Sequence, residues 1–229
     1  MKTIGLIGGM SWESTALYYK LINEGVRNAL GQLRSASLLI YSYDFEAIKT
    51  LQYAGKWDEA GTSLAETAAR LEAAGAEAIL ICTNTMHKVA AIVETKIGIP
   101  LLHLADCTAD EVLNAGTKRV ALLGTRFTME EDFYKSRLEA RGLEVLVPGA
   151  DDIAEVNRVI YDELCQGVVL DTSRARYKAI VEQLKSLGAQ GVILGCTEIT
   201  MLIQPGDVSV PVFDTTAIHA AAAVRFAIL

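Results

Sequence analysis

Two stretches of the chain end in side chains that can transfer protons. Residues 75–85 (Gly-Ala-Glu-Ala-Ile-Leu-Ile-Cys-Thr-Asn-Thr) and residues 188–198 (Gly-Ala-Gln-Gly-Val-Ile-Leu-Gly-Cys-Thr-Glu) both begin with Gly-Ala and continue through apolar residues. When the two stretches are aligned from these glycines, Thr83 matches Cys196, whereas Cys82 matches a glycine. A match between the two cysteines is therefore off by one position, and Thr83 and Cys196 are the equivalent pair.

Two proton-transfer groups on opposite sides of a small ligand suit inversion at a carbon atom. One group removes a proton from one face, and the other delivers a proton to the opposite face. A thiol can be the base if its pKa is lowered toward neutrality, as helix N-termini tend to do, and the Thr-Glu-Ile-Thr sequence after Cys196 predicts a helix start. The alternative role is core packing, which is common for cysteine. Packing is the interpretation for Cys82, Cys107 and Cys165, whereas the polar residues that follow Cys196 favour chemistry there.

The elements that position these residues alternate between short apolar runs and amphipathic segments, which indicates parallel β-sheets covered by helices. The expected strands are residues 3–7, 36–43, 78–82, 100–104, 119–124, 143–147, 192–195 and 210–214. The first expected helix begins at Ser11. Further helices are expected over residues 57–74, 84–93, 153–165, 173–187 and 217–229, and a loop or short helix is expected at 44–52.

The second half of the chain repeats the first in order. The shift between matching segments falls slowly, from 116 residues between Thr3 and Arg119 to 111 residues between Ile99 and Val210. The pattern predicts an internal duplication that gives two pseudo-twofold-related, doubly wound domains, one formed by residues 1–100 plus 210–229 and the other by 101–209. Ligands of such sheets bind beyond the carboxyl ends of strands, so the active site is expected in the interdomain cleft.

Composition narrows the classes of partner. The chain has 229 residues, is 51% hydrophobic and carries a net charge of −7, which argues against a basic nucleic-acid-binding face. No apolar run approaches the ~20 residues of a membrane span. A membrane partner is therefore not expected. The four cysteines lack zinc spacing and are expected to be reduced. His103 and His219 show no partner pattern, so a metal site is not expected either. These features favour a cytoplasmic protein.

Three short motifs carry a family resemblance. Gly5-Leu-Ile-Gly-Gly-Met10, Cys82-Thr-Asn-Thr-Met-His87 and Gly195-Cys-Thr-Glu198 resemble the signatures of the cofactor-independent aspartate/glutamate racemase family, and the similarity covers essentially the whole chain. The Met-Ser-Trp-Glu and Thr-Asn-Thr-Met-His-Lys details are most similar to the enterobacterial, broad-specificity branch. The resemblance implies an isomerase that needs no pyridoxal phosphate (PLP), works on an amino-acid substrate with catalytic residues Thr83 and Cys196, and forms a homodimer.

The resemblance also implies a set of substrate-binding residues, namely Met10, Gln52, Asn84, Thr85, Thr197 and Glu198. Asn84 and Thr85 begin a predicted helix, where donors can hold an α-carboxylate, although plain N-capping is the alternative. Glu198 could receive the substrate ammonium group or a proton from Cys196, or it could be a solvated carboxylate. His87 could tune Thr83, but packing is the expected role. Many members of the family carry a lysine near the end of the 160–165 helix, and in this chain Cys165 or its neighbours take that place.

Threonine makes the predicted mechanism asymmetric, because its hydroxyl is a far weaker acid than a thiol. Cys196 is then the resting base and Thr83 the proton donor, which favours one enantiomer as substrate, and the resemblance suggests the L form. Three related activities on the same fold remain alternatives for this chain, namely those of a maleate isomerase, of a hydantoin racemase and of a decarboxylase that needs only one cysteine. A non-catalytic module that binds small carboxylates is the further alternative.

Overall fold

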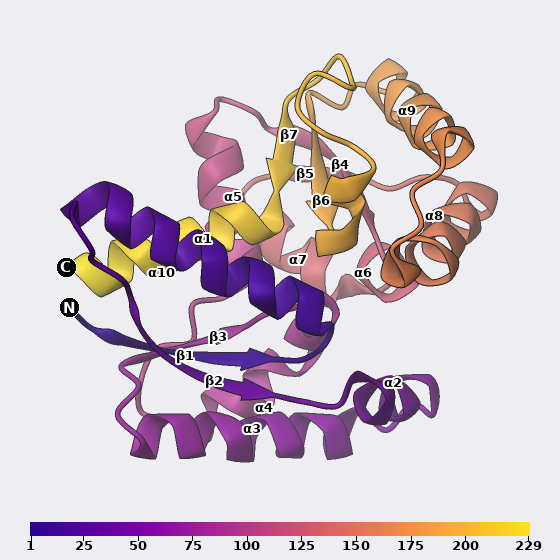
Figure 1. Ribbon diagram of the computed structural model, residues 1–229. Coiled ribbons are helices and arrows are strands. Elements are labelled where there is room, and N and C mark those ends of the chain that lie inside the picture. Colours follow the sequence, from indigo (N-terminus) through magenta and orange to yellow (C-terminus); the bar gives the residue numbers. More distant parts are fainter. The chain divides into compact units, whose positions relative to one another are not determined.

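The computed structural model describes all residues, 1–229, and the chain divides into two compact units. Unit 1 contains Met1–Leu104 and His219–Leu229, and unit 2 contains Ala105–Ile218. Each unit holds one parallel β-sheet with helices packed on it (Figure 1). The predicted class, α/β with parallel sheets in two domains, is confirmed.

Unit 1 is built on a three-stranded sheet of order β2-β1-β3. Its elements are β1 (Thr3–Gly8), α1 (Trp12–Leu30), β2 (Ser37–Ser42), α2 (Phe45–Tyr53), α3 (Trp57–Ala73), β3 (Ala78–Ile81), the 3-10 helix η1 (Thr85–Val89), α4 (Ala90–Glu94) and most of α10 (Thr215–Ile228). The predicted helix at 84–93 is therefore two short pieces, a 3-10 turn followed by one α-helical turn. The short segment 44–52 is helical, as α2.

Both faces of the unit 1 sheet are covered, because successive strand residues point to opposite sides. Ile4 and Leu6 of β1 face α1 and α10, in a cluster with Tyr18 and Val224. Ile7 of β1 faces the other way, in a cluster with residues of α2, α3 and η1. Figure 1 shows α1 and α3 on opposite sides of this sheet. A strand buried on both faces is the reason for the continuous apolar run in the sequence.

Unit 2 is built on a four-stranded sheet of order β5-β4-β6-β7. Its elements are α5 (Leu104–Asn114), β4 (Arg119–Gly124), α6 (Arg126–Glu130), α7 (Asp132–Ala140), β5 (Glu144–Leu146), α8 (Ala150–Asp162), η2 (Leu164–Gln166), α9 (Asp171–Ser186), β6 (Gly191–Gly195), η3 (Thr197–Met201) and β7 (Val212–Asp214). Helices α8 and α9 pack on one face of the sheet, where they bury side chains of β4 and β6 such as Leu123 and Leu194.

The internal repeat is visible in equivalent backbone details. The helices α3 and α9 are each followed by a glycine with φ of 102°, Gly75 and Gly188, before β3 and β6 begin. This left-handed conformation favours glycine, which explains why the two glycines give the correct alignment. Pro100 in unit 1 accepts a backbone hydrogen bond of 2.9 Å from Ile79, and Pro211 in unit 2 accepts one of 2.9 Å from the matching Val192.

The chain changes units later than the sequence indicated. Residues 210–214 were predicted in the first domain, but β7 pairs with β6 in the sheet of unit 2. The predicted strand at 100–104 is reduced to one parallel bridge, between Ile79 and Leu101 within unit 1, and α5 begins at Leu104. Each repeat thus keeps its own copy of the proline segment, and the chain passes to the other unit after that copy.

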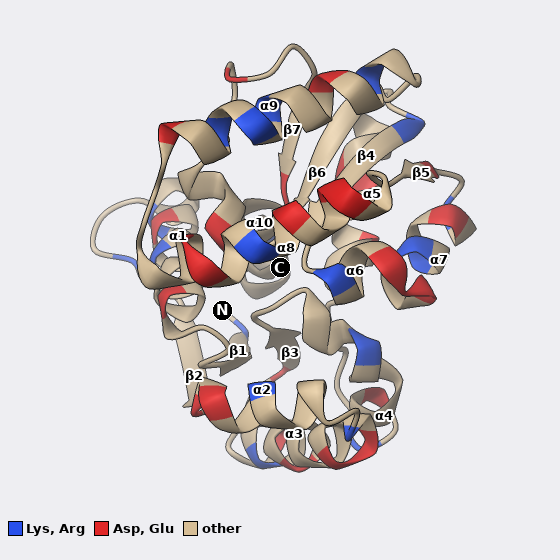
Figure 2. Cartoon of the chain, turned by 90° about the vertical axis from the view of Figure 1, so that its right-hand side faces the viewer, with Lys and Arg blue, Asp and Glu red and all other residues tan.

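Charged residues of both signs are spread over the helices, including α3 and α9 (Figure 2). Some of them pair along the helix at i,i+4 or i,i+3 spacing, such as Glu66 with Arg70 and Glu182 with Lys185. Exposed pairs of this kind contribute little to stability, and they leave the inner faces of the helices apolar. No helix of the structure is long and apolar enough to span a bilayer.

Candidate active site

Thr83 lies beyond the carboxyl end of β3, as predicted, with Cys82 between it and the last strand residue, Ile81. Cys82 before it is fully buried, and burial raises the pKa of this thiol well above its usual range. Thr83 itself is partly exposed, and Asn84 and Thr85 after it are buried. The Asn84 side chain makes no capping hydrogen bond to η1, so plain N-capping is not its role. The structure thus separates a packing cysteine from the polar residues that follow it.

Gln52 lies beside this segment and is only 4% exposed. Its amide nitrogen Nε2 donates to the sulfur of Met86 at 3.0 Å, one residue beyond Thr85. Its oxygen Oε1 is buried without a hydrogen-bond partner in the protein. Met10 packs in the same apolar cluster as Met86. A buried acceptor without a partner is costly, and a ligand that donates a proton to it would remove that cost.

The three histidines of the chain form one buried cluster in unit 1, which the sequence did not predict. His87, His103 and His219 are 3%, 4% and 0% exposed, respectively. The ring centroids of His87 and His103 are 4.5 Å apart, and those of His87 and His219 are 5.8 Å apart. They come from η1, from the residue before α5 and from α10, so no local spacing could signal the cluster. No group of three or more His, Cys, Asp or Glu residues in the structure, this cluster included, is arranged so that it could hold a metal ion.

Cys196 lies at the equivalent place in unit 2, directly after β6. Its thiol donates to Oε2 of Glu198 at 2.9 Å. Thr197, between them, accepts a hydrogen bond of 3.2 Å at its hydroxyl from Thr216. Thr197 also begins η3, a five-residue 3-10 helix instead of the predicted α-helix. The three predicted site residues of unit 2 are therefore consecutive, with Cys196 bonded to Glu198 and Thr197 bonded to Thr216.

The electrostatic setting of Cys196 differs from the prediction. Burial, and after it the negative charge of Glu198, raise the pKa of the Cys196 thiol well above its usual range. The expected lowering by a helix N-terminus is wrong, because a single 3-10 turn has little dipole and the carboxylate lies closer to the sulfur. The resting residue is a thiol whose proton points at a carboxylate. It becomes a thiolate only when Glu198 or another group accepts that proton.

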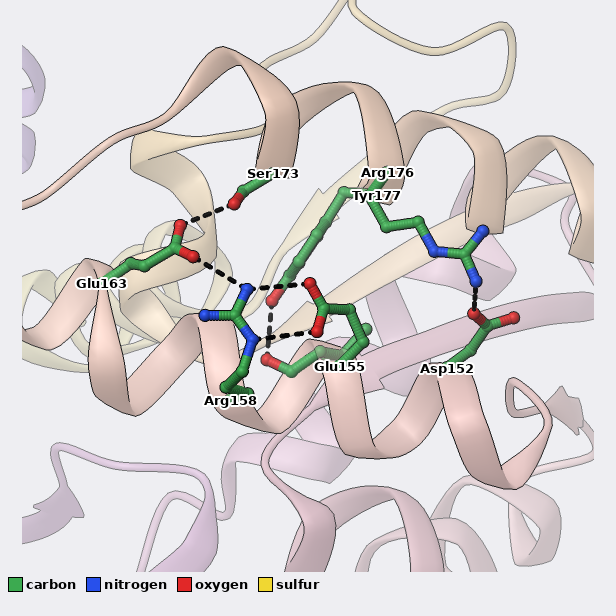
Figure 3. A network of polar contacts seen from close by, with 8 residues as sticks. Asp152, Glu155, Arg158, Glu163, Ser173, Arg176 and Tyr177 are labelled. Atoms are coloured by element: carbon green, nitrogen blue, oxygen red, sulfur yellow. Dashed lines mark hydrogen bonds and ion pairs between the residues drawn. The ribbon is translucent and has the colours of Figure 1, made fainter.

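A network of polar contacts fixes the chain at the end of α8 and at η2, the region where the family resemblance implies a lysine (Figure 3). The Glu163 carboxylate, 8% exposed, accepts from Ser173 Oγ at 2.6 Å and pairs with Arg158 Nη2 at 2.9 Å. Arg158 also pairs with Glu155 on the same helix, α8, and thereby lowers the pKa of that carboxyl. The network holds η2, and Cys165 of η2 packs on the apolar cluster that Cys196 also contacts. Arg158, the cation of this region, is thus paired with the carboxylates of Glu155 and Glu163.

The predicted site residues therefore form two groups, one in each unit. The group in unit 1 comprises Met10, Gln52, Thr83, Asn84 and Thr85, and the group in unit 2 comprises Cys196, Thr197 and Glu198. Sequence analysis missed the histidine cluster and Ser14, whose hydroxyl donates to the Cys82 carbonyl at 3.1 Å. Such long-range contacts leave no periodic signal in a single sequence.

Comparison with known proteins gives consistent results. The family model of Asp/Glu/hydantoin racemases matches residues 7–223. A broad specificity amino-acid racemase of Bacillus subtilis, RacX, is 24% identical over 219 residues, which are 93% of each chain. A crystal structure of a candidate Asp/Glu racemase from Yersinia pestis is 52% identical with a TM-score of 0.95, and that of PH1733, an aspartate racemase homologue from Pyrococcus horikoshii, is 39% identical with a TM-score of 0.89. Each of these two matches covers 100% of this chain and 100% of the other chain.

The sequence motifs, the fold of the whole chain and the family model, which spans residues 7–223, therefore all indicate the same family. They agree with the positions of Thr83 and Cys196 after equivalent strands. The chain belongs to the Asp/Glu/hydantoin racemase family.

Proposed function

We propose that this chain is a PLP-independent racemase of aspartate or glutamate, in which Cys196 and Thr83 exchange protons with opposite faces of the α-carbon. The observation that carries the proposal is the equivalence of the two residues. Each follows the equivalent apolar strand of its repeat, β3 in unit 1 and β6 in unit 2, within a chain of the racemase family. A two-base inversion needs one such group on each side of the substrate.

The binding residues proposed around the substrate have suitable chemistry. Asn84 and Thr85 supply amide, hydroxyl and backbone donors for the α-carboxylate, which must stabilise the carbanion formed beside it. Gln52 offers its buried Oε1 to the ammonium group. Thr197 and Glu198 are the binding residues proposed from unit 2. Near Cys165, Arg158 is already paired with Glu155 and Glu163, so it does not identify a binding group for the side-chain carboxylate of the substrate. The choice between aspartate and glutamate is therefore part of the test.

Proton transfer in the forward direction begins at Cys196. Glu198 Oε2 lies 2.9 Å from the sulfur and takes the thiol proton as the substrate binds. The positive ammonium group offsets the charge that otherwise disfavours the thiolate. The thiolate then removes the α-proton, and the Thr83 hydroxyl delivers a proton to the opposite face of the carbanion. The cycle closes when the Thr83 alkoxide takes a proton from solvent and Glu198 returns its proton to solvent.

The pair is unequal, because threonine is a poor resting base. The enantiomer whose α-proton faces Cys196 is the better starting substrate, and family resemblance suggests that it is the L form. The equilibrium constant of racemisation is one, so kcat/KM must be equal in the two directions. The preference can therefore appear in kcat and KM separately, or as exchange of the α-proton with solvent without inversion.

Proton NMR in D2O tests the proposal, with L- and D-aspartate and L- and D-glutamate and no added cofactor. We expect deuterium to enter the α-position, Cys196→Ala and Cys196→Ser to abolish exchange and inversion, and Thr83→Cys to raise kcat in the slower direction. Unchanged exchange in Cys196→Ala would remove the central claim. Binding without exchange would indicate a carboxylate-binding module, and release of carbon dioxide from malonates would indicate a decarboxylase.

A further inference from the structure

His87 contacts the backbone of the residue proposed to donate the proton. Its Nδ1 lies 2.8 Å from the carbonyl oxygen of Thr83, and its Nε2 lies 3.2 Å from the backbone nitrogen of Leu104. A carbonyl can only accept and a backbone N–H can only donate, so the ring is neutral with its proton on Nδ1. His87 therefore links Thr83 to the backbone at Leu104, the last residue of the first segment of unit 1.

The neighbouring carbonyl is held in the same manner. Ser14, near the start of α1, donates from its hydroxyl to the carbonyl of Cys82 at 3.1 Å. Two successive carbonyls at the end of β3 thus accept hydrogen bonds from side chains of two different elements. The Thr83 main chain is fixed by these bonds, while the residue itself is partly exposed.

The packing around His87 limits its movement. His103 and His219 contact its ring, and His219 is itself held by two hydrogen bonds. Tyr18 donates from its hydroxyl to Nδ1 of His219 at 2.9 Å, and Nε2 of His219 donates to the Leu102 carbonyl at 2.6 Å. A histidine enclosed by oriented rings keeps its tautomer and direction.

The second repeat has no counterpart of this arrangement. The alignment that matches Thr83 with Cys196 matches His87 with Thr200. Thr200 donates from its hydroxyl to the Thr197 carbonyl at 2.7 Å, one residue beyond the Cys196 carbonyl. Only the first repeat, which contains Thr83, therefore has a histidine that holds the carbonyl of the proposed proton-transfer residue.

We propose that His87 is a positioning residue, whose Nδ1–H holds Thr83 at the place from which its hydroxyl reprotonates the substrate carbanion. The inference rests on the proposed racemase function. A weakly acidic donor has to lie close to the carbanion, and a displacement of about 1 Å can cost about 100-fold in rate. The hydrogen bond from His87 is made to Thr83 and not to Cys196, so abstraction of the α-proton by Cys196 should not depend on His87.

Two matched variants separate positioning from packing. Asparagine at position 87 can place its amide nitrogen where Nδ1 lies and keep the bond to Thr83, but it loses the acceptor for Leu104. Glutamine can place its amide oxygen where Nε2 lies and keep the acceptor for Leu104, but it loses the donor to Thr83. Both variants remove one hydrogen bond and the same ring, so a purely structural role predicts similar losses in thermal stability and in activity.

The readout is the ratio of inversion to solvent exchange for L-aspartate and L-glutamate in D2O, from α-proton NMR and chiral analysis of the product. We expect His87→Gln to lower this ratio about 10- to 100-fold, toward that of Thr83→Ala, with exchange maintained. We expect His87→Asn to keep the ratio within about threefold of the parent value at a similar Tm.

Equal ratios in the two variants would overturn the inference, as would loss of exchange together with inversion in folded His87→Gln. A failure of the racemase proposal looks different, because it appears as persistent exchange in Cys196→Ala or as no exchange in the parent protein.

Discussion

His219 should make the stability of the protein fall as the pH is lowered. Its ring is fully buried among Tyr18, His87 and the Leu102 carbonyl, and it is neutral with its proton on Nε2. Burial, and after it the neighbouring His87, lower the pKa of His219 from 6.5 to about 3. In the unfolded chain the imidazole regains its ordinary pKa. Between these two values the unfolded state binds a proton at this residue that the folded state does not bind.

The sign and size of the effect follow from this difference. A depressed folded-state pKa on a base means that stability is present above the unfolded pKa and is lost as the pH falls below it. Well inside the window the free energy of unfolding decreases by about 1.4 kcal/mol per pH unit. At about pH 5 the loss relative to about pH 7.5 is about 2 kcal/mol.

Urea denaturation of the parent protein and of His219→Gln at several pH values measures this term. Glutamine can still donate to the Leu102 carbonyl but cannot titrate, so the variant should lose about 2 kcal/mol less than the parent between those two pH values. Tyr18→Phe is the control, because it removes one hydrogen bond and leaves the buried imidazole, so its pH dependence should match that of the parent. Parallel curves for His219→Gln and the parent would refute the reasoning.

Three further outcomes are expected. Gln52→Met removes a buried oxygen without a protein partner, so the free energy of unfolding should be unchanged or raised by about 1 kcal/mol in urea titrations, while kcat/KM falls at least about tenfold. Arg158→Met leaves the Glu163 carboxylate without its cation and should cost about 2 kcal/mol, whereas Glu163→Gln should cost less, again by urea titration. Gly75→Ala and Gly188→Ala should each cost about 1–2 kcal/mol in φ strain. Thermal unfolding should show similar losses for the two variants, because the Cβ at position 188 would meet a guanidinium nitrogen at 2.6 Å that lies at the movable end of the Arg119 side chain.

The parts of the fold that follow from local chemistry could be predicted from the sequence. The apolar runs at β1 and β4 are buried on both faces, and such strands are readable as continuous hydrophobic stretches. The register of the repeat was readable because glycine is favoured at the φ of 102° that Gly75 and Gly188 adopt. The placement of Thr83 and Cys196 at the carboxyl ends of equivalent strands followed from that register.

The parts that depend on distant contacts could not be predicted. Whether residues 210–214 pair with one sheet or the other is decided by tertiary packing, and the sequence pattern is the same for both. The pKa of Cys196 depends on the direction of the Glu198 side chain and on burial, neither of which the helix-start pattern encodes. The histidine cluster unites residues more than a hundred positions apart, so His219 looked isolated in the sequence.

The two repeats support their proposed proton-transfer residues in different ways, and the difference matches the chemistry that each must perform. A base has to lose a proton before it can act, and Cys196 has a carboxylate acceptor, Glu198, at 2.9 Å. A donor that stays protonated between turnovers needs no acceptor but needs a fixed position, and Thr83 has its carbonyl held by His87 at 2.8 Å. At the position equivalent to Glu198, the first repeat has Thr85, which carries no charge. The duplication therefore supplies two equivalent strand ends, and in the proposed mechanism the residues that follow them suit one end to proton abstraction and the other to proton delivery.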